Sequence, residues 1–429
     1  MRLLPLAGLL LLAVPAMAQD TLGVRLGITY TAGTRPGLVI LPGPGLDSIR
    51  TIMGRDLDYS DRFEVVSLPA SEVSRGGSTR SGALNYALYR TLGASYGLEV
   101  ASTPTGVRLR LHDLAAGAVR REQDAPLPSP ESPAFRMEVH RMSDEVVRWI
   151  TGLPGIAATQ FVFLVDKQAY RIDSDGYNLT AVTGSSEQVL SPAWAADGSR
   201  VAYTRFHEGS GPVVIEDLRT GGTTTVPGTG RDLNITPSFS PDGQWLAFAR
   251  VAEDGTDIFK VNLTGGGAPQ RLTAGRFADN LSPTFSPDGR RIAFVSTRAG
   301  LPQVYVMSTD GTDQELLAPF DYGVTGSSNA PDWSPDGASL VFHRDVSRSP
   351  QIFVLDVNSR RVRQLTSSGR NEDPTWAPDG RHVAFISDRS GRRQLWIIDM
   401  ETGRVRQVRT TGAVRLPSWS RRMTGTTAQ

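Results

Sequence analysis

A short motif recurs through the second half of the chain and limits the folds that the chain can adopt. Its fullest copy, S-P-T-F-S-P-D-G, occupies residues 282–289. Successive copies are separated by 45, 46, 48, 43 and 43 residues, counted between their first prolines. A period of this length indicates a repeat protein in which each repeat is one supersecondary unit. The first prolines are Pro192, Pro237, Pro283, Pro331, Pro374 and Pro417.

Each repeat has the sequence pattern of short strands. In the repeat that begins at Pro283, apolar residues alternate or run together over residues 291–296, 303–307 and 315–317. Gly, Pro, Asp or Ser bounds each of these pieces, which are too short for helices. With the aromatic stretch around the proline they make four strands joined by tight turns. Four-stranded units of this length predict propeller blades rather than solenoid turns.

The two ends of the repeat region complement each other. Residues 160–165, 169–173 and 179–182 match the second, third and fourth strands of a repeat. The last copy of the motif, at residues 416–420, supplies only a first strand. Pairing these fragments completes one blade beside five whole repeats and removes exposed sheet edges. We therefore predict that residues 156–429 form an all-β, six-bladed propeller closed by a C-terminal strand.

Residues 1–18 have the pattern of a secretory signal peptide. They combine one positive charge, an apolar run and the small residues of Ala16-Met17-Ala18, which is typical of a signal peptidase site. A buried strand or a membrane anchor is the alternative, although the run is short and interrupted by proline. The chain has no cysteine, so we expect neither a lipid-modified cysteine at this end nor disulfide bonds. The expected location is the periplasm.

Residues 19–155 do not repeat, and their mixture of elements predicts a small N-terminal α/β domain. Helical spacing marks residues 46–57, 83–92 and 134–150. The last helix is expected to bury one apolar face, which consists of Phe135, Val139, Met142, Val146 and Ile150. Extended pieces are expected at residues 24–28, 38–41, 63–66, 98–101 and 107–112. Glycine and proline at residues 152–155 end the last helix and leave almost no linker.

The charge balance argues against a nucleic-acid-binding protein. The chain has 45 basic and 44 acidic residues, and loss of Arg2 with the signal peptide would leave the mature protein formally neutral. A locally basic stretch near the C-terminus is interpreted as a solvated strand face, with an anionic partner as the alternative. Its arginines are Arg360, Arg361, Arg363, Arg392, Arg393, Arg404, Arg406 and Arg409.

Two motifs in the first domain resemble parts of enzymes. Residues 93–97 read G-x-S-x-G, the pattern of a nucleophile elbow, which needs a strand before the serine and a helix after it. A helix is predicted before Ser95 and a strand after it, which argues against an elbow. Residues 43–45, Gly-Pro-Gly, resemble a phosphate-binding turn, but Pro44 lacks an amide donor and the third glycine is absent. We interpret them as the start of a helix.

Metal sites find little support in the sequence. Residues 173–178 carry oxygen ligands at alternate positions, as calcium loops do, but the closing glutamate is missing and other repeats have a hairpin turn there. The five histidines show no pair at the spacing of zinc ligands. We expect no metal and no cofactor. The histidines are His112, His140, His207, His343 and His382.

The chain resembles the TolB family, whose members are periplasmic propeller proteins of the Tol-Pal envelope system. In the first domain and at its end, the resemblance is carried by residues 55–63, R-D-L-D-Y-S-D-R-F, and by residues 140–147, 151–152 and 155–156. In the propeller it is carried by six P-x-[WF]-[SA] motifs. The S-P-D-G repeats alone would be unspecific, because secreted peptidases and other propellers use them.

The resemblance implies an adaptor rather than an enzyme. It implies that loops at the propeller mouth dock a Pal-like outer-membrane lipoprotein, that the mature N-terminus engages a TolA-like inner-membrane protein, and that one partner changes the affinity for the other. The positions that match the lipoprotein site are Leu233, Asn234, Ile235, Thr236, Asn280, Leu281, Ser282, Asn329 and Asn371. The positions that match the N-terminal site are Asp20, Thr21, Leu22, Gly23, Val24 and Arg25.

Three of these asparagines, Asn234, Asn280 and Asn371, precede the motif proline by three residues. An amide both donates and accepts hydrogen bonds, so it can bind the backbone of a partner or of its own turn. The sequence leaves both roles open.

Two other classes of function were weighed against the adaptor. A hydrolase of the prolyl-peptidase type would need a further domain of roughly two hundred residues, for which the chain leaves no room outside the propeller. A propeller that binds or cleaves a small molecule, sugar or peptide in its channel remains an alternative. We expect a monomer that is peripheral to membranes.

Overall fold

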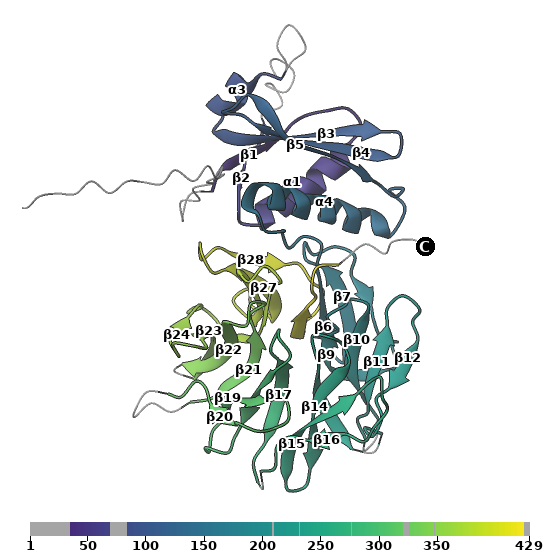
Figure 1. Cartoon of the computed structure of the whole chain (residues 1–429), viewed down its shortest axis with the longest axis vertical. Helices are drawn as coiled ribbons and strands as arrows, with labels where there is room; N and C mark the ends of the chain where they lie inside the picture. Colours follow the sequence, from purple (N-terminus) through teal and green to yellow (C-terminus); the bar gives the residue numbers. More distant parts are fainter. Residues whose placement is uncertain are drawn as a thin grey trace, which may run out of the picture. The chain divides into compact units, whose positions relative to one another are not determined.

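The computed structural model of the chain (Figure 1) describes residues 35–68, 84–207, 210–230, 232–275, 277–320, 326–346 and 348–423. All of them belong to one compact unit, which starts at Gly33. The predicted signal peptide, the extended piece at residues 24–28 and the predicted TolA-binding residues 20–25 lie outside the described residues. Among the residues that the structure describes, no helix is both long and apolar enough to cross a membrane.

The N-terminal region is a five-stranded sheet with helices, as predicted. The strand order is β2-β1-β3-β4-β5; β1 pairs in parallel with β2 and β3, whereas β3, β4 and β5 are antiparallel. The five apolar residues expected on one face of the last helix are all buried against the sheet and the first helix. The elements are β1 Gly37–Ile40, α1 Asp47–Tyr59, β2 Glu64–Val65, α3 Tyr86–Thr91, β3 Ala94–Thr103, β4 Gly106–Asp113, β5 Ala118–Pro126 and α4 Ala134–Thr151.

Strand β5 is not predicted by the sequence pattern. It places charged residues in succession, on both faces of the strand, so it lacks the apolar alternation that marks β4. Cross-strand ion pairs hold it instead: Arg108 lies 2.6 Å from Asp124 and Arg110 lies 2.7 Å from Glu122. Charged pairs across neighbouring strands stabilise a sheet. A strand held in this way has no hydrophobic alternation by which it could be predicted.

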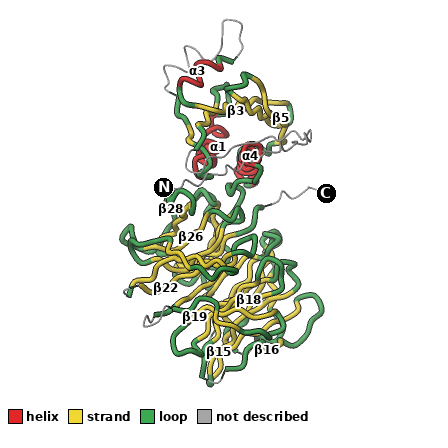
Figure 2. Tube along the Cα trace, turned by 60° about the vertical axis from the view of Figure 1, so that its left-hand side comes forward, coloured by secondary structure: helices red, strands yellow, loops and turns green. Residues whose placement is uncertain are grey.

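The rest of the described chain forms six antiparallel four-stranded blades, seen as strands in Figure 2. Blade 1 consists of β29 Val414–Trp419, β6 Gln160–Val165, β7 Gln168–Asp173 and β8 Thr180–Ala181. Blade 2 consists of β9 Gln188–Trp194, β10 Arg200–Phe206, β11 Val213–Asp217 and β12 Thr223–Thr225. Blade 3 consists of β13 Leu233–Phe239, β14 Trp245–Ala252, β15 Gly255–Asn262 and β16 Gln270–Arg271.

The other three blades follow in chain order. Blade 4 consists of β17 Asn280–Phe285, β18 Arg291–Ser296, β19 Gln303–Ser308 and β20 Glu315–Leu316. Blade 5 consists of β21 Ser328–Trp333, β22 Ser339–Val346, β23 Ser349–Asp356 and β24 Val362–Gln364. Blade 6 consists of β25 Asn371–Trp376, β26 His382–Ser387, β27 Gln394–Asp399 and β28 Val405–Val408.

The ring closes through blade 1, as the ends of the repeat region predict. Strand β29 pairs antiparallel with β6, with Val414 opposite Val165 and Trp419 opposite Phe161. The Trp419 ring centroid lies 4.4 Å from that of Phe161, and its Nε1 donates to Thr159 Oγ1 at 2.8 Å. The six-bladed propeller closed by a C-terminal strand is therefore confirmed.

Buried side chains fill the space between neighbouring blades. One cluster joins Val304 of blade 4 to Trp333 and Phe342 of blade 5. The second strand of each blade contains a run of buried residues, as in β18. A single blade cannot bury both faces of its sheet, so the ring is the unit that folds.

Candidate partner-binding end and central channel

The first strand of every blade has the same irregularity at the motif proline. In β17 the register with β18 shifts between Leu281 and Thr284, so Ser282 and Pro283 form a bulge. Proline has no amide hydrogen, and a bulge is where a strand tolerates that loss. The residue before each proline adopts a positive φ of 49–52°, a conformation that costs a non-glycine residue free energy. These residues are Ser191, Thr236, Ser282, Ala330, Asp373 and Leu416.

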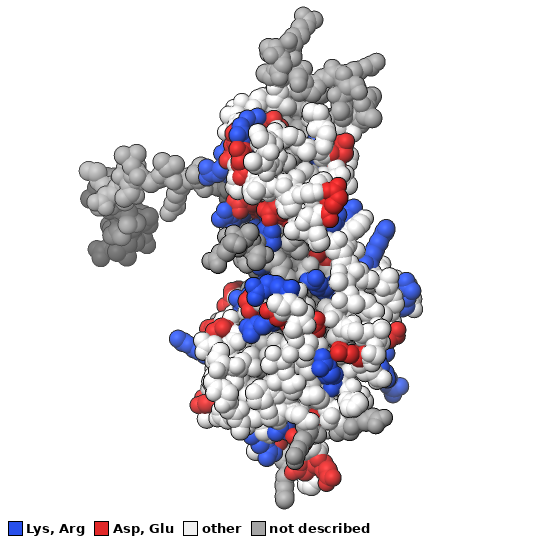
Figure 3. Space-filling view, turned by 90° about the vertical axis from the view of Figure 1, so that its right-hand side faces the viewer, with Lys and Arg blue, Asp and Glu red and all other residues white. Residues whose placement is uncertain are grey.

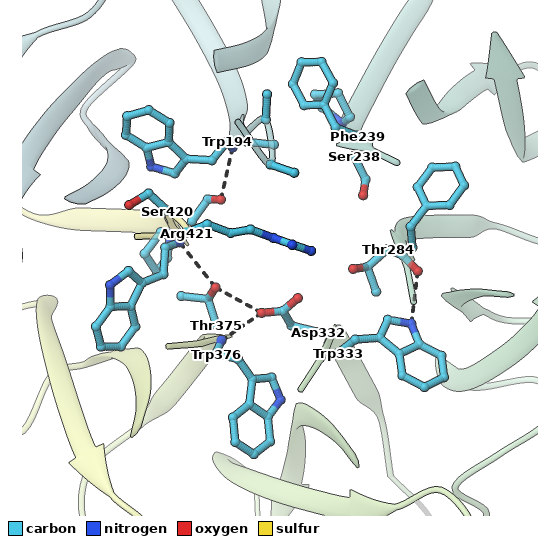
Figure 4. Close-up of a pocket in the computed structure, with 18 of the residues that line it drawn as sticks. Trp194, Ser238, Phe239, Thr284, Asp332, Trp333, Thr375, Trp376, Ser420 and Arg421 are labelled. Atoms are coloured by element: carbon cyan, nitrogen blue, oxygen red, sulfur yellow. Dashed lines mark hydrogen bonds between the residues drawn. The ribbon is translucent and has the colours of Figure 1, made fainter. Parts of the chain in front are cut away.

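The six bulged strands surround a central channel with a cavity of about 760 Å³. The residues after the prolines include Ser238, Thr284, Asp332 and Thr375, whose side chains Figure 4 shows around the middle of the ring. Arg421, which follows β29, extends its side chain toward the same space. Hydroxyl groups, two carboxylates and the guanidinium groups of Arg421 and Arg422 therefore line a channel whose other walls are mainly proline, alanine and aromatic residues.

Most polar groups of the channel bind the neighbouring blade. The Asp332 carboxylate accepts from Thr375 Oγ1 at 3.0 Å and from the Trp376 amide at 2.8 Å. Thr375 Oγ1 in turn accepts from the Trp419 amide at 3.4 Å. Burial raises the pKa of Asp332 above the usual value for a carboxyl group, and these hydrogen bonds partly offset that effect. The ring of side chains thus ties first strands together.

His343 of blade 5 and Asp373 of blade 6 are two neighbouring titratable residues near the channel. The Asp373 amide donates to His343 Nδ1 at 3.2 Å. Burial raises the pKa of the Asp373 carboxyl and lowers the pKa of His343. Among the described residues, no hydrogen bond joins a serine or threonine hydroxyl to a histidine ring, which is the pairing that activates a hydroxyl nucleophile.

Three of the predicted partner-binding asparagines are wholly buried and make hydrogen bonds within the propeller, to the preceding blade and, for Asn234 and Asn371, to their own turns as well. Asn280 Nδ2 donates to the Thr256 carbonyl and to Asp257 Oδ1, both at 3.1 Å, and its Oδ1 accepts from Arg298 at 3.0 Å. Asn234 and Asn371 accept in the same way from arginines of their second strands or the turns after them. These contacts favour a structural role within the propeller for Asn234, Asn280 and Asn371, whereas Asn329 is half-buried.

The arginine partners of these asparagines were missed in the sequence. Arg250, Arg298 and Arg389 each lie over aromatic rings of their own blade, with distances of 4.4, 4.9 and 5.1 Å to a ring centroid. In blade 5, Arg344 donates to Ser328, which replaces the asparagine, and lies 4.1 Å over Phe320. Their recurrence 16 or 18 residues after the asparagine or serine is the signal that could have revealed them.

Substitution of the asparagines separates the two roles. Asn280→Ala is expected to lower the free energy of unfolding by about 2 kcal/mol, because the buried Asp257 carboxylate and the Arg298 guanidinium each lose a hydrogen-bond partner. Asn329→Ala is expected to change it by about 0.5 kcal/mol or less, since its side chain is half-buried. Urea denaturation of both variants measures the difference. A greater loss for Asn329→Ala than for Asn280→Ala would contradict this assignment.

The end of the propeller at which the first strands begin, here called the mouth end, exposes apolar side chains. Phe206 ends β10, Phe277 precedes β17, and Leu301 lies in the hairpin between β18 and β19. They are 44 %, 87 % and 45 % exposed. The register places all three at the mouth end, because the end of each second strand pairs with the start of the first. Isolated exposed apolar residues are common, whereas several at one end of a fold make that end a candidate docking surface.

The predicted contact residues lie at the same end of the propeller as these apolar side chains. Leu233, Ile235, Leu281 and Ser282 occupy the first strands of blades 3 and 4 and are half-buried. The residue two places before the proline is Leu190, Ile235 and Leu281 in blades 2 to 4, but Asn329, Glu372 and Arg415 in blades 5, 6 and 1. The mouth end is thus apolar on one side and polar on the other. Phe206, Phe277 and Leu301 could not be found from periodicity, since they lie at strand ends and in loops.

The other candidate motifs take the local structures that the sequence favours. Helix α3 precedes Ser95, which lies exposed within β3, so the G-x-S-x-G segment has no elbow. Residues 43–45 lie in the turn between β1 and α1, which begins at Asp47. Residues 173–178 form the turn after β7, and Asp175 there contacts Arg55 at 3.2 Å.

Charged groups of both signs lie close together on the face shown in Figure 3, with large uncharged areas between them. Several arginines of the basic C-terminal stretch make internal contacts: Arg360 lies 2.9 Å from Glu315, Arg393 lies 2.9 Å from Glu372, and Arg406 lies 4.2 Å from the centroid of the Tyr59 ring. These contacts favour a structural role for them over a site for an anionic partner.

The chain is a β-propeller protein. It has six blades, closed by the C-terminal strand, and an α/β region that precedes them. Residues 147–322 and 314–426 match the family described as TolB beta propeller domain. The chain belongs to the TolB β-propeller family.

Known proteins that resemble the chain agree with this assignment. It is 29 % identical to the Tol-Pal system protein TolB of Xanthomonas oryzae pv. oryzae over 232 residues. This match covers 49 % of this chain and 51 % of the relative. It is 31 % identical over 217 residues to that of Bordetella avium, 48 % of this chain and 47 % of the relative. The matches thus span about half the length of these curated relatives. The crystal structure of TolB from Acinetobacter baumannii superposes with a TM-score of 0.77 at 23 % identity, over 90 % of this chain and 97 % of that one, which shows a shared fold.

Proposed function

We propose that this protein is a periplasmic adaptor of a Tol-Pal system that docks a Pal-like lipoprotein at its mouth end. The exposed apolar side chains of Phe206, Phe277 and Leu301 support this proposal, because they lie at the same end of the propeller as the half-buried Leu233 and Leu281, which the family resemblance assigns to the lipoprotein. Interfaces bind through a few apolar anchors surrounded by polar residues. The half of the mouth end that carries Asn329, Glu372 and Arg415 would supply that polar rim.

The proposal includes the remaining assignments of the family. Residues 20–25 would engage a TolA-like inner-membrane protein by adding an extended segment to its sheet. The signal peptide at residues 1–18 would direct the protein to the periplasm, with residues 19–155 and 156–429 as its two domains. Binding without catalysis is the proposed activity, and it requires no cofactor.

Loss of the exposed apolar residues is expected to weaken lipoprotein binding at least tenfold, or about 1.4 kcal/mol. Phe277→Asn suits the positive φ of 59° at this position, and Leu301→Ser removes a second apolar side chain. The double variant and the unchanged mature protein would be titrated with the soluble domain of the peptidoglycan-associated lipoprotein from the same cells. Isothermal titration calorimetry measures the dissociation constants.

The control for this titration is Leu153→Ser. Leu153 is 56 % exposed but follows α4, away from the mouth end, so its loss should leave the affinity unchanged. Equal affinities of the double variant and the unchanged protein would contradict docking at these residues.

A channel ligand is the second candidate function. The cavity of about 760 Å³ is of the size that small-molecule sites have, and Asp332 and Asp373 provide carboxylates in it. A sugar or a peptide fits such a lining of hydroxyl and carboxyl groups. The Phe277 and Leu301 variants distinguish the two functions, because neither residue lines the channel and their loss would leave a channel ligand bound.

A further inference from the structure

Two wholly buried histidines lie where the α/β part meets the propeller. One belongs to the α/β part and faces carboxylates of the propeller, and the other belongs to the propeller and faces a carboxylate of the α/β part. His140, on α4, lies 2.8 Å by its Nδ1 from Asp56 of α1. Its Nε2 faces Asp173 and Asp175 of blade 1, each at 3.9 Å, and has no hydrogen-bond partner among the residues that the structure describes. The ring therefore lies among three carboxylates from the two parts of the chain.

The second histidine belongs to the propeller. His382, at the start of β26, lies 2.8 Å by its Nδ1 from Asp379. Its Nε2 lies 3.2 Å from Asp61, which follows α1 in the other part of the chain. A doubly protonated ring donates to both carboxylates, whereas a neutral ring has one N–H and turns a lone pair toward the other carboxylate. The contact between His382 of the propeller and Asp61 of the α/β part therefore depends on whether the histidine ring is doubly protonated.

Charged groups from every neighbouring element surround these rings. Near His140, Arg55 and Arg136 contact Asp175, Arg406 is close to the same carboxylate, and Arg422 lies 3.3 Å from Asp144. Near His382, Arg35 and Arg404 contact Asp61, Arg62 faces Asp379, and Arg381 binds Asp399 and Glu401. Arg404 also binds Asp58. The arginines repel a metal cation, so we regard these clusters as proton sites.

The histidines are the groups here whose charge changes just above neutral pH. Burial by itself would lower the pKa of His140, but Asp56, Asp175 and Asp173 raise it to about 9. Burial opposes Asp379 and Asp61 in the same way at His382, whose pKa is raised to about 9. Burial lowers the pKa of Arg406 to about 10, so this group loses its charge only at a higher pH than the two histidines do.

The sign of the pH dependence follows from these shifts. An unfolded histidine has a pKa of 6.5, so each native ring stabilises the folded protein fully below that pH. The stabilisation is lost as the pH rises toward 9. Burial raises the pKa of Asp144 to about 7, and its titration is therefore complete before that of the histidines.

We propose that His140 and His382 form a latch that holds the α/β part on the propeller while both rings are doubly protonated and releases it when each ring loses its proton to alkaline solvent. The latch responds to the pH outside the cell if the protein is periplasmic, and it acts away from the mouth end. Its failure would leave the docking proposal untouched. Histidine protonation is a common means of switching an interface near neutral pH.

Spin labels can measure the release, because the chain has no cysteine and two introduced cysteines are unique. Ala116→Cys in the exposed turn before β5 and Thr224→Cys in exposed β12 place one label on each part. The mature full-length protein would be examined by double electron–electron resonance from about pH 7 to about pH 10. We expect one narrow distance distribution near pH 7 that broadens or shifts as the pH passes 9, while far-UV circular dichroism stays constant.

Variants test whether the histidines cause the change. His140→Gln with His382→Gln should give the broad distribution already near pH 7, and each single variant should retain only part of the response to pH. His207→Gln is the matched control, because His207 is exposed at the mouth end and should leave the response intact. A distribution that does not change with pH, a full response in both single variants, or loss of circular dichroism together with the distance change would each overturn the latch.

Discussion

Replacement of Trp419 by alanine is expected to lower the free energy of unfolding by about 4 kcal/mol. The indole is 6 % exposed, packs on Phe161 and donates a hydrogen bond to Thr159. Both partners lie at the start of the propeller, so this one side chain joins the two ends of the repeat region. Such a loss is a large part of the 5–15 kcal/mol, roughly, that stabilises a typical protein. Urea denaturation followed by far-UV circular dichroism measures it.

Trp333→Ala is the matched control for the closure of the ring. Trp333 occupies the same motif position in blade 5, is equally buried and donates to the Thr284 carbonyl at 3.2 Å. Its removal should cost a similar free energy, because it creates a similar cavity. Only Trp419→Ala should also speed hydrogen exchange in β6, since Leu164 and Val165 pair with β29. Equal exchange of these amides in both variants would argue against closure by β29.

Most of the propeller could be predicted because its information is local and repeated. Within one repeat, the strand expected at residues 291–296 is β18, residue for residue. The six copies of the motif proline also predict where the first strands lie, since each copy repeats the same turn and the same aromatic position. Closure could be inferred from chemistry alone: an open ring would leave two sheet edges without partners.

The features that escaped prediction depend on contacts between residues far apart in the sequence. Asp61 and His382 are 321 positions apart, and neither lies in a pattern that marks a buried cluster. The charged strand β5 is held by cross-strand ion pairs, which leave no apolar period. The sequence locates the asparagines that precede the motif proline at the mouth end, but it does not determine their role, because an amide can form hydrogen bonds with its own protein or with a partner equally well. Burial and the hydrogen bonds within the propeller favour the structural role for Asn234, Asn280 and Asn371.

Arg381 belongs to the group of residues that only the folded chain brings together. Its side chain is 3 % exposed and makes a two-point contact with the wholly buried Asp399, with Nε and Nη2 each 2.6 Å from a carboxylate oxygen. Nη2 also donates to the Asp61 carbonyl at 3.0 Å. Burial would raise the pKa of Asp399, but hydrogen bonds from Arg381 and Thr402 hold it below its ordinary value. The carboxylate therefore depends on this arginine for its charge.

Arg381→Met is expected to lower the free energy of unfolding by about 4 kcal/mol, because it leaves a buried carboxylate without its partner. Arg404→Met is the comparison: Arg404 pairs with Asp58 and Asp61 but is 36 % exposed, so its loss should cost about 1 kcal/mol or less. Adding Asp399→Asn to Arg381→Met should recover part of the loss, since an amide needs no counter-charge. Urea denaturation near neutral pH measures all three variants. Equal losses for Arg381→Met and Arg404→Met would mean that water reaches Asp399 and that the buried pair does not hold this junction.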